Sequence, residues 1–211
     1  MKLTIFGATG GTGTCLVEQA LAAGHDVTAV VRDPARLTVP GQQGLRVVTA
    51  DVMKPAAISP VLAAADAVIS ALGPHGTGRT TISQDSVKSI IQAMQESGVQ
   101  RLLTVSGTIV TDEGEGAVMR YVLKPAVRAT FLRHVCADMR QAEEVVHNSR
   151  LDWTIMRPPG LTAKAATGTY RTAIERNLRH GTTISRADLA ACMLTLINDP
   201  AAVRNHICVA Y

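Results

Sequence analysis

Three glycines in one short segment have the spacing of a phosphate-binding turn. An apolar run, Leu3 to Phe6, leads directly into Gly7-Ala8-Thr9-Gly10-Gly11-Thr12-Gly13, and a helical pattern follows. Glycines at the first, fourth and seventh positions allow a sharp turn, close approach of the backbone to a diphosphate, and tight packing of helix on strand. The first amides of the helix then face the anion, and the hydroxyls of Thr9 and Thr12 add donors. An ordinary glycine-rich turn is the alternative, but the position between strand and helix favours dinucleotide binding.

The end of the second apolar run indicates which dinucleotide binds. An NAD site usually has Asp or Glu there for the ribose 2′-hydroxyl, whereas an NADP site has Arg for the 2′-phosphate. The run ends at Val31 and continues Arg32-Asp33-Pro34-Ala35-Arg36. Asp33 has the position of an N-cap ahead of a proline. Because Arg32 and Arg36 suit a phosphate dianion, the sequence predicts NADPH as the cofactor, with solvated surface arginines as the alternative.

Residues after the third and fourth apolar runs complete the predicted cofactor site. Asp51 and Val52 would flank the adenine, although Asp51 has an equally good interpretation as a cap of the next turn. Leu72 and Gly73 follow the fourth run, where a glycine lets the backbone pass close to the cofactor.

Ser106 ends the fifth apolar run, at the edge of the sheet where ligands bind in such folds. We expect its hydroxyl to lie near the nicotinamide and to orient the substrate, so Ser106 is the predicted catalytic residue. A serine that merely satisfies a turn is the alternative.

A dedicated proton donor is missing from the sequence. Many dehydrogenases with this glycine turn use Tyr-x-x-x-Lys, which places both side chains on one helix face. Here Tyr121 is followed by Lys124, one residue short of that spacing. Because a localised alkoxide needs such a donor while a delocalised anion takes a proton from solvent, the gap favours a flavin, quinone or tetrapyrrole acceptor.

The elements that must position these residues alternate between short apolar strands and helices. The patterns predict strands over residues 3–6, 26–31, 45–50, 67–72, 101–106, 153–156 and 206–210, and helices over 13–23, 55–65, 80–97, 139–148 and about 185–198. Residues 107–137 and the stretch after Gly160 are irregular. We therefore predict an α/β fold, a Rossmann-like doubly wound parallel sheet with helices on both faces and a small C-terminal substrate elaboration, as a single domain over 1–211.

Composition excludes several function classes. Of 211 residues 46% are hydrophobic, which is enough to form a sizeable core. Only 3% are aromatic, so a surface that stacks nucleic-acid bases is not expected. The net charge of +4 is too small to indicate DNA binding. Four cysteines without paired spacing, and histidines without ligand spacing, predict no disulfide frame and no metal site. No run is long enough to span a membrane, and we expect a cytoplasmic monomer or small homo-oligomer acting on a small molecule.

Taken together, these motifs resemble the atypical short-chain dehydrogenase/reductase-like NAD(P)H-binding proteins, with the biliverdin-IXβ reductase/flavin reductase family nearest and NmrA-like proteins more distant. The resemblance rests on the motifs Ile5 to Gly13, Val31-Arg32-Asp33, Asp51-Val52, Ala71-Leu72-Gly73, Val105-Ser106, Arg157-Pro158-Pro159 and Ile184-Ser185. It implies NADPH-dependent reduction of flavins or linear tetrapyrroles, with Pro158 added to the cofactor site. The chain departs from the family at Gly160 and Met139, where the reductase has histidines.

Two function classes follow from these expectations. The first is an NADPH-dependent oxidoreductase that acts on a planar conjugated acceptor lying over Ser106. The second is a non-catalytic, NmrA-like sensor of NADP(H), which the missing Tyr/Lys pair fits equally well. A sugar-nucleotide epimerase is disfavoured by the absent tyrosine.

Overall fold

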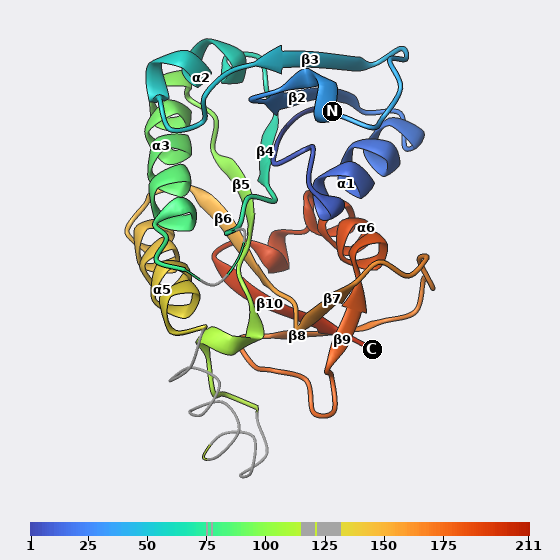
Figure 1. Cartoon of the computed structure of the whole chain (residues 1–211), viewed down its shortest axis with the longest axis vertical. Helices are drawn as coiled ribbons and strands as arrows, with labels where there is room; N and C mark the ends of the chain where they lie inside the picture. The colour runs from blue at the N-terminus through green and yellow to red at the C-terminus, as the bar shows by residue number, and fades with distance from the viewer. Residues whose placement is uncertain (75, 77, 115–120, 122–131) are drawn as a thin grey trace.

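An eight-stranded sheet forms the centre of the molecule, seen in a computed structural model that describes residues 1–74, 76, 78–114, 121 and 132–211 (Figure 1). The strand order is β3-β2-β1-β4-β5-β6-β10-β8, and only β8 runs antiparallel to its neighbour. Their bounds are β1 Lys2–Phe6, β2 Asp26–Val31, β3 Leu45–Thr49, β4 Ala67–Ser70, β5 Arg101–Val105, β6 Asp152–Arg157, β8 Arg171–Ile174 and β10 Asn205–Ala210.

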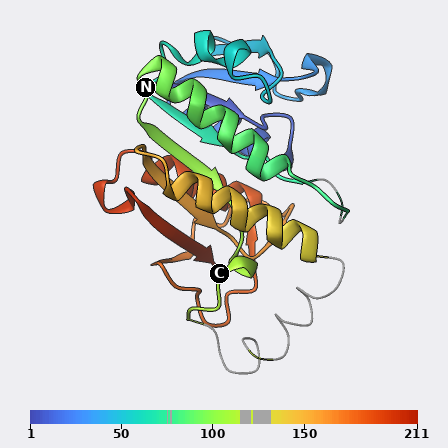
Figure 2. The same cartoon turned by 90° about the vertical axis from the view of Figure 1, so that its left-hand side faces the viewer.

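Helices cover both faces of this sheet. The helices α1 (Gly11–Ala22) and α6 (Arg186–Leu196) pack together on one face, and α2 (Pro55–Leu62), α3 (Ile82–Ser97) and α5 (Arg133–His147) on the other (Figures 1 and 2). Strand residues alternate between two buried cores: Leu3 and Ile5 pack toward α1 and α6, whereas Phe6 packs toward α2 and α3. The predicted doubly wound Rossmann-like sheet is therefore confirmed.

The order in which strands are added to the sheet switches sides at β1: β2 and β3 lie on one side of it, and β4 and the later strands on the other. The strand β1 pairs with β2 on one side and with β4 on the other, both in parallel register. All three strands therefore end at the same edge, and the segments after them diverge to opposite faces. This is the switch point at which open α/β sheets bind ligands.

Helix α5 begins at Arg133, six residues before the predicted start at 139. The extra turn contains Asp138, which is buried and accepts hydrogen bonds from the amides of Ser83 and Gln84 at 3.0 Å each. These amides belong to the first turn of α3, so α5 caps a neighbouring helix. This contact joins segments that are far apart in the sequence, so the local sequence pattern around residues 133–138 does not reveal the earlier start of α5. The helix α2 is also shorter than predicted and ends at Leu62.

Three short strands in the stretch after Arg157 were not predicted. Strands β7 (Gly160–Thr162) and β9 (Thr183–Ser185) pair in parallel, and β8 adds to the edge of the main sheet beside β10. Each has at most four residues, which is too short for a recognisable apolar run, and β8 is in addition largely exposed. Their pairing partners, rather than local preference, determine them.

The described part of the chain contains no helix that is long and apolar enough to cross a bilayer. In the same residues no group of three His, Cys, Asp or Glu side chains is arranged to hold a metal ion. The four cysteines are reduced thiols rather than members of disulfides, and Cys136, Cys192 and Cys208 are buried. Burial raises the pKa of Cys192 to about 12, which keeps this thiol protonated and unreactive.

Candidate functional site

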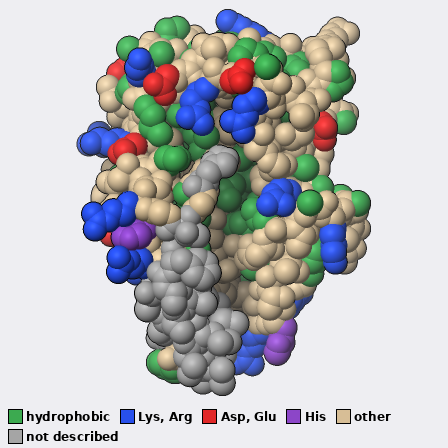
Figure 3. Space-filling model, viewed as in Figure 1, with side chains coloured by type: hydrophobic (Ala, Val, Ile, Leu, Met, Phe, Trp, Pro, Cys, Tyr) green, Lys and Arg blue, Asp and Glu red, His purple; other side chains and the backbone are tan. Residues whose placement is uncertain are grey.

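A cavity of about 250 Å³ opens at the carboxyl edge of β1, β2, β3 and β4. Its lining combines the glycine turn, apolar strand ends and three arginines: Phe6, Gly7, Thr9, Gly10, Gly11, Thr12, Val30, Val31, Arg32, Arg36, Ala50, Val52, Ala71, Leu72, Gly73, Pro74 and Arg186. Figure 3 shows hydrophobic side chains at the bottom of a hollow on this face and Lys and Arg side chains around it. An apolar cleft with cations at its rim suits a flat ligand that carries anionic groups.

The glycine turn is tight enough to require glycine at two positions. Gly7 has φ +78°, and a Cβ there would lie 2.8 Å from the carbonyl carbon of Ala71. A Cβ on Gly13 would lie 2.0 Å from the carbonyl oxygen of Gly7. Both clashes involve backbone atoms, which cannot rotate away. The turn therefore brings α1 against β1 and points the start of α1 into the cavity.

The start of α1 provides free donors for an anion. Its N-cap is Gly10, which supplies no side-chain cap, and the first turn has no acidic residue. The first helical hydrogen bond runs from the amide of Thr14 to the carbonyl of Gly10 (2.8 Å). The amides of Gly11 and Thr12 therefore have no acceptor within the helix. Together with the positive end of the helix dipole, these donors fit a phosphate group.

Two exposed arginines stand at the cavity beyond the end of β2. Arg32 and Arg36 both line it, and neither forms a salt bridge with another described residue. The carboxylate of Asp33 accepts a hydrogen bond from the amide of Ala35 (3.0 Å), which confirms its predicted N-cap role. The acidic side chain is therefore engaged locally, and the guanidinium groups are available to an anion.

Ten of the thirteen predicted cofactor residues line this one cavity, and three do not. Gly13 lies behind the turn, where it allows the close packing just described. The carboxylate of Asp51 accepts a hydrogen bond from the amide of Met53 (3.1 Å), as its alternative interpretation required. Pro158 is buried beside β5, and its carbonyl accepts from the amide of Thr108 (3.0 Å). A cofactor contact by these three stays a prediction.

Arg186 is a cavity residue that sequence reasoning missed. It is the first residue of α6, and it follows the capping residue Ser185. The sequence Ser185-Arg186-Ala187-Asp188 has the spacing of a helix-capping motif, and the hydroxyl of Ser185 accepts from the amide of Asp188 (2.9 Å). The motif could have drawn attention to Arg186, but only the packing of α6 along α1 shows that it reaches the glycine turn.

Ser106 lies in a separate small cavity of about 10 Å³ between β5 and α5, with Met139 and Glu143 among its lining residues. Its hydroxyl is buried and has no hydrogen-bond partner among the described residues, while its amide donates to the carbonyl of Met156 (2.8 Å). A buried hydroxyl without a partner is unusual and is available to a ligand. Tyr121, by contrast, is 70% exposed, and Lys124 lies outside the described residues.

A buried carboxylate, Asp188, fixes the start of α6 next to this site. It accepts hydrogen bonds from the hydroxyls of Tyr211 (2.6 Å) and Ser185 (3.0 Å) and from the amides of Thr167 and Gly168 (2.9 Å each). Burial opposes ionisation of Asp188, but these donors outweigh it and lower its pKa from 3.8 to about 2. The ionised carboxylate therefore ties the end of the chain and the 167–168 turn to α6.

Replacing Asp188 with asparagine should reduce the free energy of unfolding by about 2 kcal/mol at pH 7. The pKa is lower in the folded state, so the stabilisation is present above about pH 4 and disappears as the pH falls toward 2. Urea unfolding of both proteins between pH 7 and pH 3 measures this, with the exposed Asp85→Asn as control. A difference that does not change with pH would contradict the role of the ionised carboxylate.

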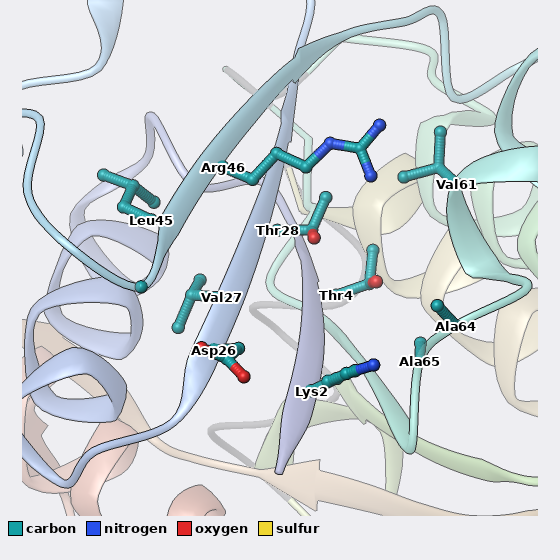
Figure 4. A pocket seen from close by; sticks show the side chains of 11 residues that line it. Lys2, Thr4, Asp26, Val27, Thr28, Leu45, Arg46, Val61, Ala64 and Ala65 are labelled. Atoms are coloured by element: carbon teal, nitrogen blue, oxygen red, sulfur yellow. The ribbon is translucent and has the colours of Figure 1, made fainter.

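A larger cavity, of about 390 Å³, lies at the opposite, amino end of β1, β2 and β3 (Figure 4). Register places Thr4 beside Thr28 and Thr28 beside Arg46, on the face where α2 ends. Lys2 and Asp26 complete a polar surface that contains none of the predicted site residues. Size alone does not identify the site, because ligands of such sheets bind at the carboxyl ends of the strands.

The fold and the cavity define a dinucleotide-binding protein of the Rossmann type. Comparison with known proteins gives the family: the sequence model of the NAD(P)H-binding proteins matches residues 7–200, and the chain belongs to this family. An uncharacterized chloroplastic protein of Arabidopsis thaliana is 34% identical over 199 residues, which are 90% of this chain and 69% of the plant protein.

Solved structures agree with this assignment. ChuY from Escherichia coli O157:H7, an anaerobilin reductase, superposes with a TM-score of 0.78 at 28% identity and covers 100% of this chain and 97% of its own. A short-chain dehydrogenase/reductase of Veillonella parvula, solved with NADP, has a TM-score of 0.81 at 18% identity, with 100% and 94% covered. The chain thus has an NAD(P)H-binding oxidoreductase fold.

Proposed function

We propose that this protein is an NADPH-dependent oxidoreductase that transfers a hydride to a planar conjugated acceptor, such as a flavin, a quinone or a linear tetrapyrrole. The observation that carries the choice of NADPH is the arginine pair, Arg32 and Arg36, which lines the cavity without a salt bridge among the described residues. The name of the Escherichia coli relative, an anaerobilin reductase, supports a reductase activity on a molecule of this class.

The chain's own groups divide the work of holding the cofactor. The amides of Gly11 and Thr12 would hold the diphosphate, and Arg32 and Arg36 the 2′-phosphate. Apolar residues such as Val52 and Leu72 would cover the rings and exclude water. When bound, the nicotinamide supplies a hydride, and the protein contributes binding and orientation.

The class of acceptor is inferred from the lack of a buried tyrosine donor among the described residues at the site. Tyr121 points to solvent, with 70% of its surface exposed, and is not positioned as a buried proton donor. An acceptor that spreads negative charge over a conjugated system takes its proton from solvent after receiving a hydride. The buried hydroxyl of Ser106, which has no hydrogen-bond partner in the described part of the chain, would then orient the acceptor by one hydrogen bond.

Replacing Ser106 with alanine should lower turnover about tenfold, the effect of one lost hydrogen bond in the transition state, and leave NADPH affinity within a factor of two. Steady-state kinetics and fluorescence titration measure these two quantities. Ser89 offers a matched control, because its hydroxyl on α3 is also buried, lacks a hydrogen-bond partner within the described residues, and lines neither ligand cavity. Equal turnover in the Ser106→Ala, Ser89→Ala and unmodified proteins would reduce Ser106 to a structural residue.

A sensor of NADP(H) without catalysis is the second candidate. The small volume of the cavity beside Ser106, about 10 Å³, favours it, because an acceptor has little room there. Oxidation of NADPH, followed by absorbance with FMN and then with a quinone, separates the two functions. We expect turnover with at least one acceptor. Saturable NADPH binding with no turnover would support the sensor, and absence of binding would contradict both.

A further inference from the structure

Arg186 reaches the glycine turn from the far end of the sequence. It is half-buried, it begins α6, and it lines the cofactor cavity together with Gly10, Gly11 and Thr12. Its guanidinium has neither a salt bridge nor a hydrogen bond within the described parts of the chain. A partly buried cation without a counter-ion loses hydration and gains nothing in return, so its position calls for an anionic ligand.

Contact with Gly11 shows where this cation lies. A Cβ on Gly11 would lie 2.7 Å from the Cδ atom and 3.0 Å from the Nε atom of Arg186. The arginine side chain therefore occupies the space that any other residue at position 11 would fill. Its guanidinium is held beside the first residue of α1, whose amides are the predicted diphosphate donors.

The surroundings of Arg186 leave its charge uncompensated. Asp188 is the acidic residue in the first turn of the same helix, but five hydroxyl and amide groups from four residues already donate to its carboxylate. The start of α1 adds positive potential, with no acidic residue in its first turn. The start of α1 and the guanidinium of Arg186 thus converge on the same part of the cavity.

We propose that Arg186 is a diphosphate-binding residue that closes the cofactor site from the C-terminal side of the chain. Binding then connects the glycine turn of the N-terminal half to β9 and α6, which belong to the C-terminal elaboration. The inference rests on the proposed NADPH site, and it adds a residue and a consequence to it: the cofactor orders the segment around residues 183–190. Arg32 and Arg36 read the 2′-phosphate, while Arg186 serves any nucleotide that carries a diphosphate.

Calorimetric titration with three ligands tests this division of roles. NADPH has both groups, NADH has the diphosphate alone, and adenosine 2′-monophosphate has no diphosphate. We expect Arg186→Ala to weaken NADPH and NADH by the same factor, about tenfold or more, because a hydrogen-bonded charge is lost. The affinity for adenosine 2′-monophosphate, measured by competition, should not change. Arg186→Lys should lose less, and Arg150→Ala, which removes an exposed cation outside the cavity, should lose nothing.

Hydrogen exchange provides a second readout that does not depend on catalysis. NADPH should protect the amides of residues 183–190 in the unmodified protein but not in Arg186→Ala, while the glycine turn is protected in both. Arg186→Gln, which keeps a hydrogen-bonding side chain, replaces the alanine variant if the latter is unstable.

The possible failures are distinguishable. If the unmodified protein binds NADPH and Arg186→Ala binds it equally well, the role of Arg186 is wrong and the proposed function stands. If the loss is confined to ligands with a 2′-phosphate, Arg186 belongs with Arg32 and the diphosphate assignment is overturned. If the unmodified protein binds no nucleotide, the proposed function itself fails.

Discussion

Replacing Gly13 with alanine should lower the free energy of unfolding by about 3 kcal/mol or more and abolish measurable NADPH binding. The added Cβ would lie 2.0 Å from the carbonyl oxygen of Gly7 and 2.6 Å from its carbonyl carbon. Neither backbone atom can rotate away, so α1 must move off β1. The same carbonyl accepts the hydrogen bond from the amide of Gly10 (2.9 Å), so the phosphate-binding turn is distorted as well.

Gly41 provides the matched control for this substitution. A Cβ there meets nothing within 4 Å, and the residue has no positive φ. Gly41→Ala should therefore leave both stability and NADPH affinity unchanged, or slightly raise stability by restricting the unfolded chain. Urea unfolding and calorimetric titration of the two variants give the comparison. A stable Gly13→Ala protein that binds NADPH normally would show that the turn does not have the described geometry.

Replacing Arg32 with alanine should weaken NADPH binding about 100-fold and NADH binding by less than about threefold, because charge-assisted bonds to a phosphate dianion are lost only for NADPH. Arg32 and Arg36 line the cavity beyond β2, where the carboxylate of Asp33 is engaged with the amide of Ala35. Loss of both arginines should equalise the two affinities.

A change of charge alone can alter binding of an anionic ligand, and Arg46 controls for it. This exposed arginine on β3 lines the cavity at the opposite, amino end of the strands. Arg46→Ala removes the same charge at a distance and should leave both affinities unchanged at physiological salt. Equal losses of NADPH and NADH affinity in Arg32→Ala would remove the argument for the 2′-phosphate.

The sequence predicts the sheet and the phosphate turn well because their signals are local. The spacing of Gly7, Gly10 and Gly13 follows from backbone geometry within seven residues. Central parallel strands such as β1 and β4 are buried on both faces and have largely apolar sequences. The predicted end of α3 at residue 97 is also correct, and Gly98 after it lies in the left-handed region, which is a local signal for a helix end.

Features that depend on distant partners could not be predicted. Residues 133–138, the unpredicted start of α5, include Asp138, which caps α3 at the amide of Ser83, and β8 forms by pairing with β10. Arg186 joins the site because α6 packs along α1, although 175 positions of sequence separate it from Gly11. Asp51 and Pro158 were also predicted to contact the cofactor. In the structure the carboxylate of Asp51 accepts from the amide of Met53, and the carbonyl of Pro158 accepts from the amide of Thr108.

Titration calorimetry with NADPH tests the central claim most directly: that the glycine turn and the arginines beside it form a site for a phosphorylated dinucleotide. We predict saturable, exothermic binding of one NADPH per chain, with NADH bound at least tenfold more weakly. The absence of binding heat with either coenzyme over a range of temperatures, so that no cancellation of enthalpy can hide it, would contradict the proposal.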